Sequence, residues 1–238
     1  MRVFAGPNGS GKTTLLKGLL AENNINLGVY VNADDIELGI ALSNTLNFAD
    51  YQLVVTQEEL RYFFKQSSFS PTKRNEPDLS DKLFLLHNCL VIKTKVDSYL
   101  AADLAEFIRQ KLLITNISFT YETVMSHPGK IDFFRKAQEC GYKVYLYFIA
   151  TQDPEINVAR VITRVAQNGH PVAPDIINKR YFASLQNLHK AVKQTNRAFI
   201  FDNSERKVMF IAEIKDGSDV LLNDAISIPA WVNEYLLS

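Results

Sequence analysis

The chain has 238 residues, 47% of them hydrophobic, and its 26 Lys and Arg residues balance its 26 Asp and Glu residues. This composition excludes general disorder, and the zero net charge disfavours a long nucleic-acid footprint, which needs clustered basic residues. The two cysteines, Cys89 and Cys140, form no CxxC pair, which argues against a disulfide scaffold or a zinc site. No apolar run is long enough to span a bilayer and no signal-peptide pattern opens the chain, so we expect a cytoplasmic protein without membrane contact.

Short apolar runs alternate with helical patterns along the chain. Five runs predict strands, at Arg2–Ala5, Val29–Val31, Ile117–Tyr121, Lys143–Ala150 and Ala198–Phe201. Strands this short and apolar, separated by helices such as Thr14–Ala21, are typical of a parallel sheet covered on both faces. The sequence therefore predicts an α/β fold with a mostly parallel five-stranded core sheet, formed as a single domain over residues 1–238.

Three regions add to this predicted core. Residues 37–113 read as a helical insert that holds the substrate region, with helices at Leu83–Ile92 and Tyr99–Leu113. Residues 155–193 read as a helical lid and its following helix. Residues 205–238 read as a C-terminal β-hairpin, with its turn at Lys215–Ser218, and a short helix containing Trp231.

Residues 6–13 read GPNGSGKT and match the pattern G-x-x-x-x-G-K-[ST] in full, after a predicted strand and before a predicted helix. Glycines let successive N–H groups point at phosphate oxygens, and the helix N-terminus adds the positive end of its dipole. A tight turn alone could explain the glycines, but the lysine, the hydroxyl and the context favour a P-loop for a nucleoside triphosphate. Lys12 would reach the terminal phosphates and Thr13 would ligate Mg²⁺. The predicted nucleotide-binding residues are Gly6, Pro7, Asn8, Gly9, Ser10, Gly11, Lys12, Thr13 and Thr14.

Two aspartates, Asp34 and Asp35, directly follow the second predicted strand. Ligands of open α/β sheets gather at the carboxyl ends of strands, so a carboxylate here can accept the proton of an attacking hydroxyl. The alternative is that one of them only caps the helix that begins near Ile36. We assign the base and substrate contact to Asp34 and the cap to Asp35.

Glu122 and Thr123 lie at the end of the third predicted strand. An acidic group there can hold Mg²⁺ through water or contact the substrate, and we predict both a metal and a substrate role for Glu122 and a substrate contact for Thr123. A solvated strand-end glutamate is the alternative.

Arginines follow the fourth predicted strand. Arg160 and Arg164 are four residues apart on one helix, and Arg180 lies on the next. This arrangement is typical of a kinase lid that closes over the nucleotide and supplies positive charge to the transferring phosphoryl group. We predict that role for Arg164 and Arg180, and with less weight for Arg160; solvated surface arginines are the alternative.

Two other P-loop classes lack their signatures here. No LSGGQ-like sequence of a transporter ATPase occurs, and Asn178-Lys179-Arg180-Tyr181 lacks the aspartate of a guanine motif. Four blocks instead resemble the zeta-toxin family of P-loop kinases, in its chromosomal branch often labelled predicted ABC-type ATPase. The blocks are FAGPNGSGKTT at 4–14, VNADDI at 31–36, SFTYETVMS at 118–126, and ARVITRVAQNGHPV at 159–172 continuing into NKRYFASLQNL at 178–188.

The resemblance implies phosphorylation of a small molecule by ATP or GTP with Mg²⁺, the family's best-known acceptors being UDP-activated amino sugars. It implies phosphate and metal roles for Lys12 and Thr13, the base role for Asp34, metal and substrate contact for Glu122, and lid roles for Arg164 and Arg180. The chain departs from the family in having Asn168-Gly169 for a glycine pair and Val124 for a threonine. Its first strand begins almost at Met1, which leaves no N-terminal helix of the kind that meets an antitoxin, so we expect an antitoxin partner to be doubtful.

Two alternatives stay open. One is a regulatory module that binds a nucleotide and has no acceptor. The other is a nucleotide or polynucleotide kinase, for which only Thr72–Arg74 and Asn178–Arg180 provide local basic character.

Overall fold

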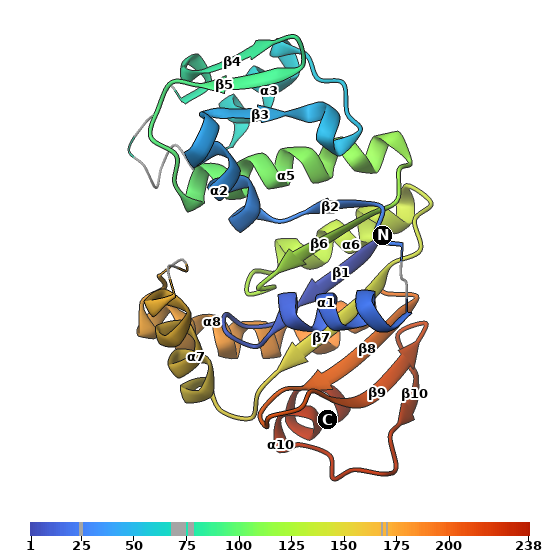
Figure 1. Cartoon of the computed structure of the whole chain (residues 1–238). Helices are drawn as coiled ribbons and strands as arrows, with labels where there is room; N and C mark the ends of the chain where they lie inside the picture. Colours follow the sequence, from blue (N-terminus) through green and yellow to red (C-terminus); the bar gives the residue numbers. More distant parts are fainter. Residues whose placement is uncertain (24–25, 68–74, 76–78, 168, 170) are drawn as a thin grey trace. The chain divides into compact units, whose positions relative to one another are not determined.

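A computed structural model of the chain describes residues 1–23, 26–67, 75, 79–167, 169 and 171–238 (Figure 1). The chain forms two compact units, the first comprising Met1–Leu27 with Thr120–Ser238 and the second Gly28–Phe119. Within these described ranges, no helix has both the length and the apolar character needed to cross a membrane. The basic residues Thr72–Arg74 and the turn residues Asn168 and His170 lie outside the described residues.

The first unit is built on a sheet with the strand order β10-β9-β8-β7-β1-β6. β6, β1, β7 and β8 run parallel to one another, whereas β9 and β10 extend the sheet as antiparallel strands. The strands are β1 (Arg2–Ala5), β6 (Phe119–Thr123), β7 (Tyr145–Ala150), β8 (Arg197–Asp202), β9 (Met209–Lys215) and β10 (Asp219–Leu222). The helices are α1 (Lys12–Asn23), α6 (Gly129–Glu139), α7 (Pro154–Ala166), α8 (Pro174–Gln186), α9 (Leu188–Val192), α10 (Ala230–Val232) and the π-helical η3 (Asn233–Leu237).

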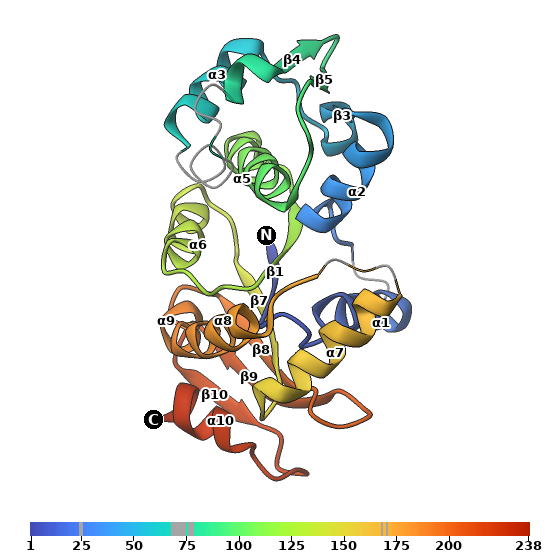
Figure 2. The ribbon, with the colours of Figure 1, turned by 90° about the vertical axis from the view of Figure 1, so that its left-hand side faces the viewer.

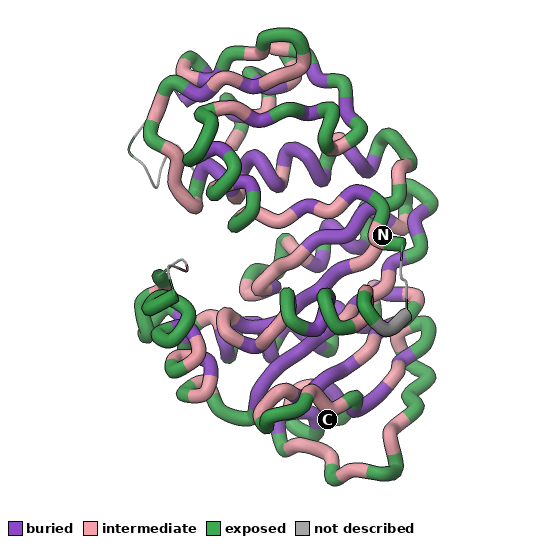
Figure 3. Tube along the Cα trace, in the orientation of Figure 1, coloured by how far each residue is buried: buried purple, intermediate pink, exposed green. Residues whose placement is uncertain are grey.

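Helices cover both faces of this sheet. Figure 2 shows α1 on one face and α6, α8 and α9 on the other, and Figure 3 shows the central strands as largely buried. Phe4, Tyr147 and Phe199 are register partners on β1, β7 and β8, and their rings stack with centroids 4.6 and 5.0 Å apart. Cross-strand aromatic pairs of this kind fix the register of the sheet.

The second unit combines helices with a small antiparallel sheet of order β3-β5-β4. This sheet consists of β3 (Thr45–Asn47), β4 (Leu83–Leu86) and β5 (Cys89–Ile92), and the short strand β2 (Val29–Val31) of the same unit is not part of it. The helices of the unit are α2 (Ala33–Ser43), η1 (Phe48–Tyr51), α3 (Gln57–Gln66), η2 (Leu79–Lys82) and α5 (Ser98–Thr115). The helix predicted at Tyr99–Leu113 is confirmed as α5, in which Leu100, Leu104, Phe107 and Ile108 form a buried stripe.

The predicted α/β fold with a mostly parallel core is confirmed. All five predicted strands are present as β1, β2, β6, β7 and β8, and the predicted C-terminal hairpin is formed by β9 and β10.

The helix that we predicted at Leu83–Ile92 is wrong, because this segment is the β4–β5 hairpin. His87 and Asn88 occupy the turn with φ angles of 47° and 65°, the left-handed pair that a two-residue hairpin requires. The Asn88 side chain donates to the Leu53 carbonyl (2.8 Å) and accepts from Val55 N–H (3.0 Å), which holds the turn in place. Eight of the ten residues of this segment are apolar, which hid the turn, and the region 37–113 is therefore mixed rather than helical.

Candidate nucleotide-binding site

The loop between β1 and α1 follows a path that only glycine permits at three positions. Gly6, Gly9 and Gly11 have φ angles of +145°, +77° and +100°. A Cβ added at Gly9 would lie 2.6 Å from the backbone oxygen of Asn157, and one at Gly11 would lie 2.4 Å from Asn203 Nδ2. The glycines of the motif therefore allow both the turn and the close approach of neighbouring segments.

Lys12 begins α1 and reaches back over the loop. Its Nζ donates hydrogen bonds to the carbonyls of Gly6 and Pro7, each at 2.9 Å. The first N–H groups of any α-helix have no acceptor within the helix, so α1 presents donors beside this ammonium. The result is a concentration of positive charge at the end of β1.

Thr13 and Glu122, distant in sequence, are brought together. The Thr13 hydroxyl lies 3.1 and 3.0 Å from the two carboxylate oxygens of Glu122 and donates to them. The end of β6 is tied to the loop by Gly6 N–H, which donates to the Thr123 carbonyl (3.2 Å). The Thr123 hydroxyl oxygen accepts from Met125 N–H (3.1 Å), so it also shapes the turn after β6. A hydroxyl beside a carboxylate is a pair of hard oxygen donors, the type that Mg²⁺ prefers.

Two asparagines hold the P-loop from outside, a role that no local sequence pattern indicated. Asn157 is fully buried on α7, and its Nδ2 donates to the Asn8 carbonyl (2.6 Å) while its Oδ1 accepts from the Thr151 hydroxyl. Asn203, after β8, donates from Nδ2 to the Ser10 carbonyl (2.8 Å). Because both amides engage carbonyl groups of the loop, they fix the peptide planes whose N–H groups would meet a phosphate.

The predicted lid arginines lie on two helices of the same unit. Arg160, on α7, donates from Nη1 to the Asn203 carbonyl (2.7 Å), which connects α7 to the segment that holds the P-loop. Arg164, in the last turn of α7, is exposed, and Arg180, on α8, is half-buried. Arg160 thus has a structural contact, and the lid roles of Arg164 and Arg180 stay predictions.

Two side-chain hydrogen bonds anchor α8 to two strand ends. The Tyr181 hydroxyl donates to the Thr151 carbonyl (2.6 Å) after β7, and the Ser184 hydroxyl donates to the Val124 carbonyl (2.7 Å) after β6. Burial, followed by nearby acidic groups, raises the pKa of Tyr181, so this hydroxyl keeps its proton. These bonds fix the backbone of the helix that carries Arg180.

Asp34 and Asp35 belong to the second unit, where both are exposed in the first turn of α2. The cap that we assigned to Asp35 is wrong, because Asn32 is the N-cap and its side chain accepts from Asp34 N–H (2.9 Å). The helix begins at Ala33, three residues earlier than expected, which places both carboxylates inside the helix. The assignment of Asp34 as the base stays a prediction.

Together, the parallel sheet and a P-loop with its lysine, hydroxyl and strand-end carboxylate define an α/β protein of the P-loop class. The zeta toxin family model matches residues 95–215, just over half of the chain, and the chain belongs to this family. An uncharacterized protein of Haemophilus influenzae is 38% identical over 66 residues, which cover 28% of this chain and 47% of that protein.

Two groups of solved structures share the fold. One is the PezAT chromosomal toxin-antitoxin system of the human pathogen Streptococcus pneumoniae, with a TM-score of 0.54, 15% identity, and coverage of 100% of this chain and 78% of that chain. The other is the AvrRxo1-ORF1:AvrRxo1-ORF2 complex, crystallised with sulphate ions (TM-score 0.53) and with ATP (0.52), each with 15% identity and coverage of 94% of this chain and 60% of that chain. The chain thus spans about half of the Haemophilus protein and three fifths of the AvrRxo1 chain.

The expectation that an antitoxin partner is doubtful is wrong. Structures that share this fold were determined as two-component complexes, one of them a toxin-antitoxin system. The expectation rested on the position of the first strand near Met1, and the position of one strand does not determine which surface of a fold a partner covers.

Proposed function

We propose that the chain is a phosphotransferase that moves the terminal phosphoryl group of ATP or GTP to a hydroxyl of a small acceptor, with a UDP-activated amino sugar as the candidate acceptor. The observation that carries the proposal is the contact of Thr13 with both oxygens of Glu122 beside the P-loop lysine. Membership of the zeta toxin family and the ATP present in a structure of the same fold support it.

The residues of the first unit fit a nucleotide with Mg²⁺. The loop glycines have no space for side chains, and the side-chain oxygens of Asn8 and Ser10 are buried without a hydrogen-bond partner in the described part of the chain. Buried polar atoms of this kind are satisfied when a polar ligand or water joins the site. Lys12 would exchange its loop carbonyls for phosphate oxygens, and Thr13 with Glu122 would hold the metal, which neutralises phosphate charge when bound.

The proposed roles of Asp34 and of the two lid arginines follow from the charges of their side chains. Asp34 would accept the proton of the acceptor hydroxyl, and Arg164 and Arg180 would stabilise negative charge that develops on the transferring group. Glu122 and Thr123 would contact the acceptor from the end of β6.

A matched pair of variants tests the proposal. Wild type, Asp34→Asn and Asp35→Asn are incubated with labelled ATP, Mg²⁺ and a panel of UDP-activated amino sugars, and transfer to the sugar is measured. A positioned general base contributes about 10²–10⁴-fold, so Asp34→Asn should lose activity on that scale while ATP affinity is kept. Asp35→Asn, which removes the neighbouring carboxylate of the same helical turn, should stay within a few-fold of wild type.

Two results would overturn the assignment. Phosphate transfer by Asp34→Asn at the wild-type rate would show that Asp34 is not the general base. ATP binding with slow hydrolysis that no acceptor accelerates would favour the regulatory module instead.

We also propose that a partner protein of the antitoxin type neutralises this activity, because a solved structure with the same fold comes from the PezAT chromosomal toxin-antitoxin system. Induced expression of the wild-type chain should arrest bacterial growth, and the Lys12→Ala variant should not. Co-expression of the protein encoded beside the chain should restore growth. Equal growth arrest by the wild-type chain and by Lys12→Ala would show that toxicity does not depend on phosphate transfer.

A further inference from the structure

A second concave site lies in the first unit, where α8 meets the C-terminal segment. It has a volume of about 280 Å³ and is here called the α8–α10 pocket. The side chains that define its character are Asp153, Tyr181, Phe182, Trp231, Glu234 and Tyr235. Neither the P-loop nor Asn203 and Arg160, which lie beside the loop, contribute to its lining, so it is distinct from the site described above.

Aromatic rings form much of the wall of this pocket. Tyr181 and Phe182 meet edge to face with ring centroids 5.2 Å apart, and Phe182 is 46% exposed. Trp231 is buried, and its indole N–H donates to Asp202 Oδ2 (2.8 Å), which fixes the orientation of the ring. The Tyr181 hydroxyl donates to the Thr151 carbonyl and its side chain is buried, so Phe182 and the half-buried Tyr235 are the rings most accessible to a ligand.

The charged side chains that line the pocket or lie behind it are all acidic. Asp153 and Glu234 line it and both are exposed, and Asp202 lies behind Trp231. These three carboxylates also contribute, after burial, to the raised pKa of Tyr181. Among the described residues that line the pocket there is no Lys, Arg or His. This lining disfavours an anion such as a nucleotide and favours a cation.

We propose that the α8–α10 pocket binds a small organic cation, an alkyl guanidinium or alkyl ammonium group. The accessible rings of Phe182 and Tyr235 attract a cation through their quadrupoles and cover its apolar stem, while Asp153 and Glu234 accept its N–H groups. The volume admits a head group with a short stem, so the source is either a free amine or the side chain of an arginine or lysine.

The test uses the full chain without nucleotide, so its result is independent of the proposed kinase activity. Agmatine is titrated at low salt by calorimetry, beside n-butylurea as a neutral planar analogue and acetyl-Gly-Arg-Gly-amide as a peptide probe. Saturable agmatine binding, with n-butylurea at least about tenfold weaker, is expected, since hydrogen bonds to charged groups are the stronger ones. Tighter binding of agmatine than of the peptide identifies a free amine as the source, and the reverse order identifies a protein side chain.

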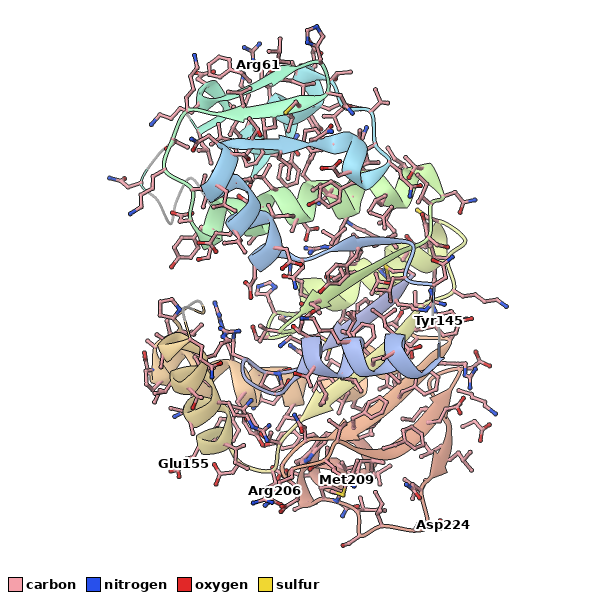
Figure 4. All side chains as sticks on the ribbon, viewed as in Figure 1. Arg61, Tyr145, Glu155, Arg206, Met209 and Asp224 are labelled. Atoms are coloured by element: carbon pink, nitrogen blue, oxygen red, sulfur yellow. The ribbon has the colours of Figure 1, made fainter. Side chains whose placement is uncertain are left out.

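Charge-only variants locate the site. Asp153 caps α7 by accepting from Glu155 N–H (2.8 Å), and Asn caps equally well, so Asp153→Asn removes the charge and keeps the cap. Asp153→Asn combined with Glu234→Gln should weaken agmatine binding at least about tenfold. Glu155→Gln, on the first turn of α7 outside the pocket (Figure 4), should stay within about twofold.

A third variant guards against loss of structure. Phe182→Ala truncates a half-exposed ring and should weaken agmatine several-fold without changing the far-ultraviolet spectrum, and the thermal midpoint should fall only slightly because the contact with the Tyr181 ring is lost. No saturable binding of agmatine to the wild-type chain, equal binding of n-butylurea, or equal weakening by Glu155→Gln would each overturn the proposal.

Discussion

Gly9 is a position where the P-loop leaves no room for a side chain. Its φ angle is +77°, and a Cβ would meet the Asn157 backbone at 2.6 Å. Gly9→Ala should lower the free energy of unfolding by about 2 kcal/mol or more, because it adds left-handed strain to a steric clash.

Gly18 provides the matched control on the same chain. It lies within α1, and a Cβ there meets no atom within 4 Å. Gly18→Ala should raise the free energy of unfolding by about 0.5–1 kcal/mol, since alanine favours the helix. Urea denaturation of both variants measures the two effects, and a tolerated Gly9→Ala would contradict the loop geometry.

Asn157 is the residue whose loss should affect nucleotide binding without touching the nucleotide. Asn157→Ala removes the part-buried donor to the Asn8 carbonyl and the buried acceptor of the Thr151 hydroxyl. An unsatisfied buried group costs about 1–3 kcal/mol, so ATP affinity should fall about tenfold as the loop loosens. Titration with a fluorescent ATP analogue measures this, with exposed Gln186→Ala as the control. An unchanged affinity for ATP would show that Asn157 supports only the folding of the chain and not the nucleotide-binding geometry of the loop.

At the scale of the element, α3 carries a pH-dependent contact. Thr56 and Glu59 form a capping box at its start, and Lys111 donates from Nζ to Glu59 Oε1 (2.5 Å). The hydrogen bond from Lys111, more than any other cause, holds the pKa of Glu59 below its usual value, even though partial burial opposes the shift. A carboxyl with a lowered folded-state pKa contributes stability above its unfolded pKa of about 4.3 and loses it as the pH falls below that value.

Glu59→Gln should therefore destabilise the chain at neutral pH. The pair is partly exposed, so the difference should stay within about 1 kcal/mol. It should shrink as the pH falls from about 5 toward 3. Thermal melts across this range measure it, and Glu58→Gln, the exposed neighbour in the same turn, should show neither the loss nor its pH dependence. A constant difference at every pH would exclude the carboxylate as its source.

At the scale of the whole molecule, the sequence predicted features that are contiguous along the chain and missed those that depend on contacts between distant residues. The P-loop and the five core strands are contiguous runs, so their residues could be read directly. Asn157 and Asn203 meet loop residues that are 149 and 193 positions away, and no local pattern reports such a contact. The β4–β5 hairpin was missed for a different reason, because its turn is made by His87 and Asn88 rather than by glycine.

Nucleotide binding should not protect the whole chain equally. The described P-loop contacts, through Asn157, Asn203 and Glu122, all lie within the first unit. ATP at 100 times its dissociation constant stabilises the folded, ATP-binding form of the unit by about 2.7 kcal/mol. Backbone amides that exchange only when this unit unfolds should therefore exchange about 100-fold more slowly.

Hydrogen exchange with and without ATP and Mg²⁺ should show this protection first in peptides that cover residues 6–13 and 151–160. Peptides of the β4–β5 hairpin, in the second unit, should change little while no acceptor is present. Lys12→Ala removes the ammonium that would bind the phosphates and should abolish the difference. Equal protection of both units by ATP alone would mean that they open as one cooperative body, and the acceptor would then not be needed to couple them.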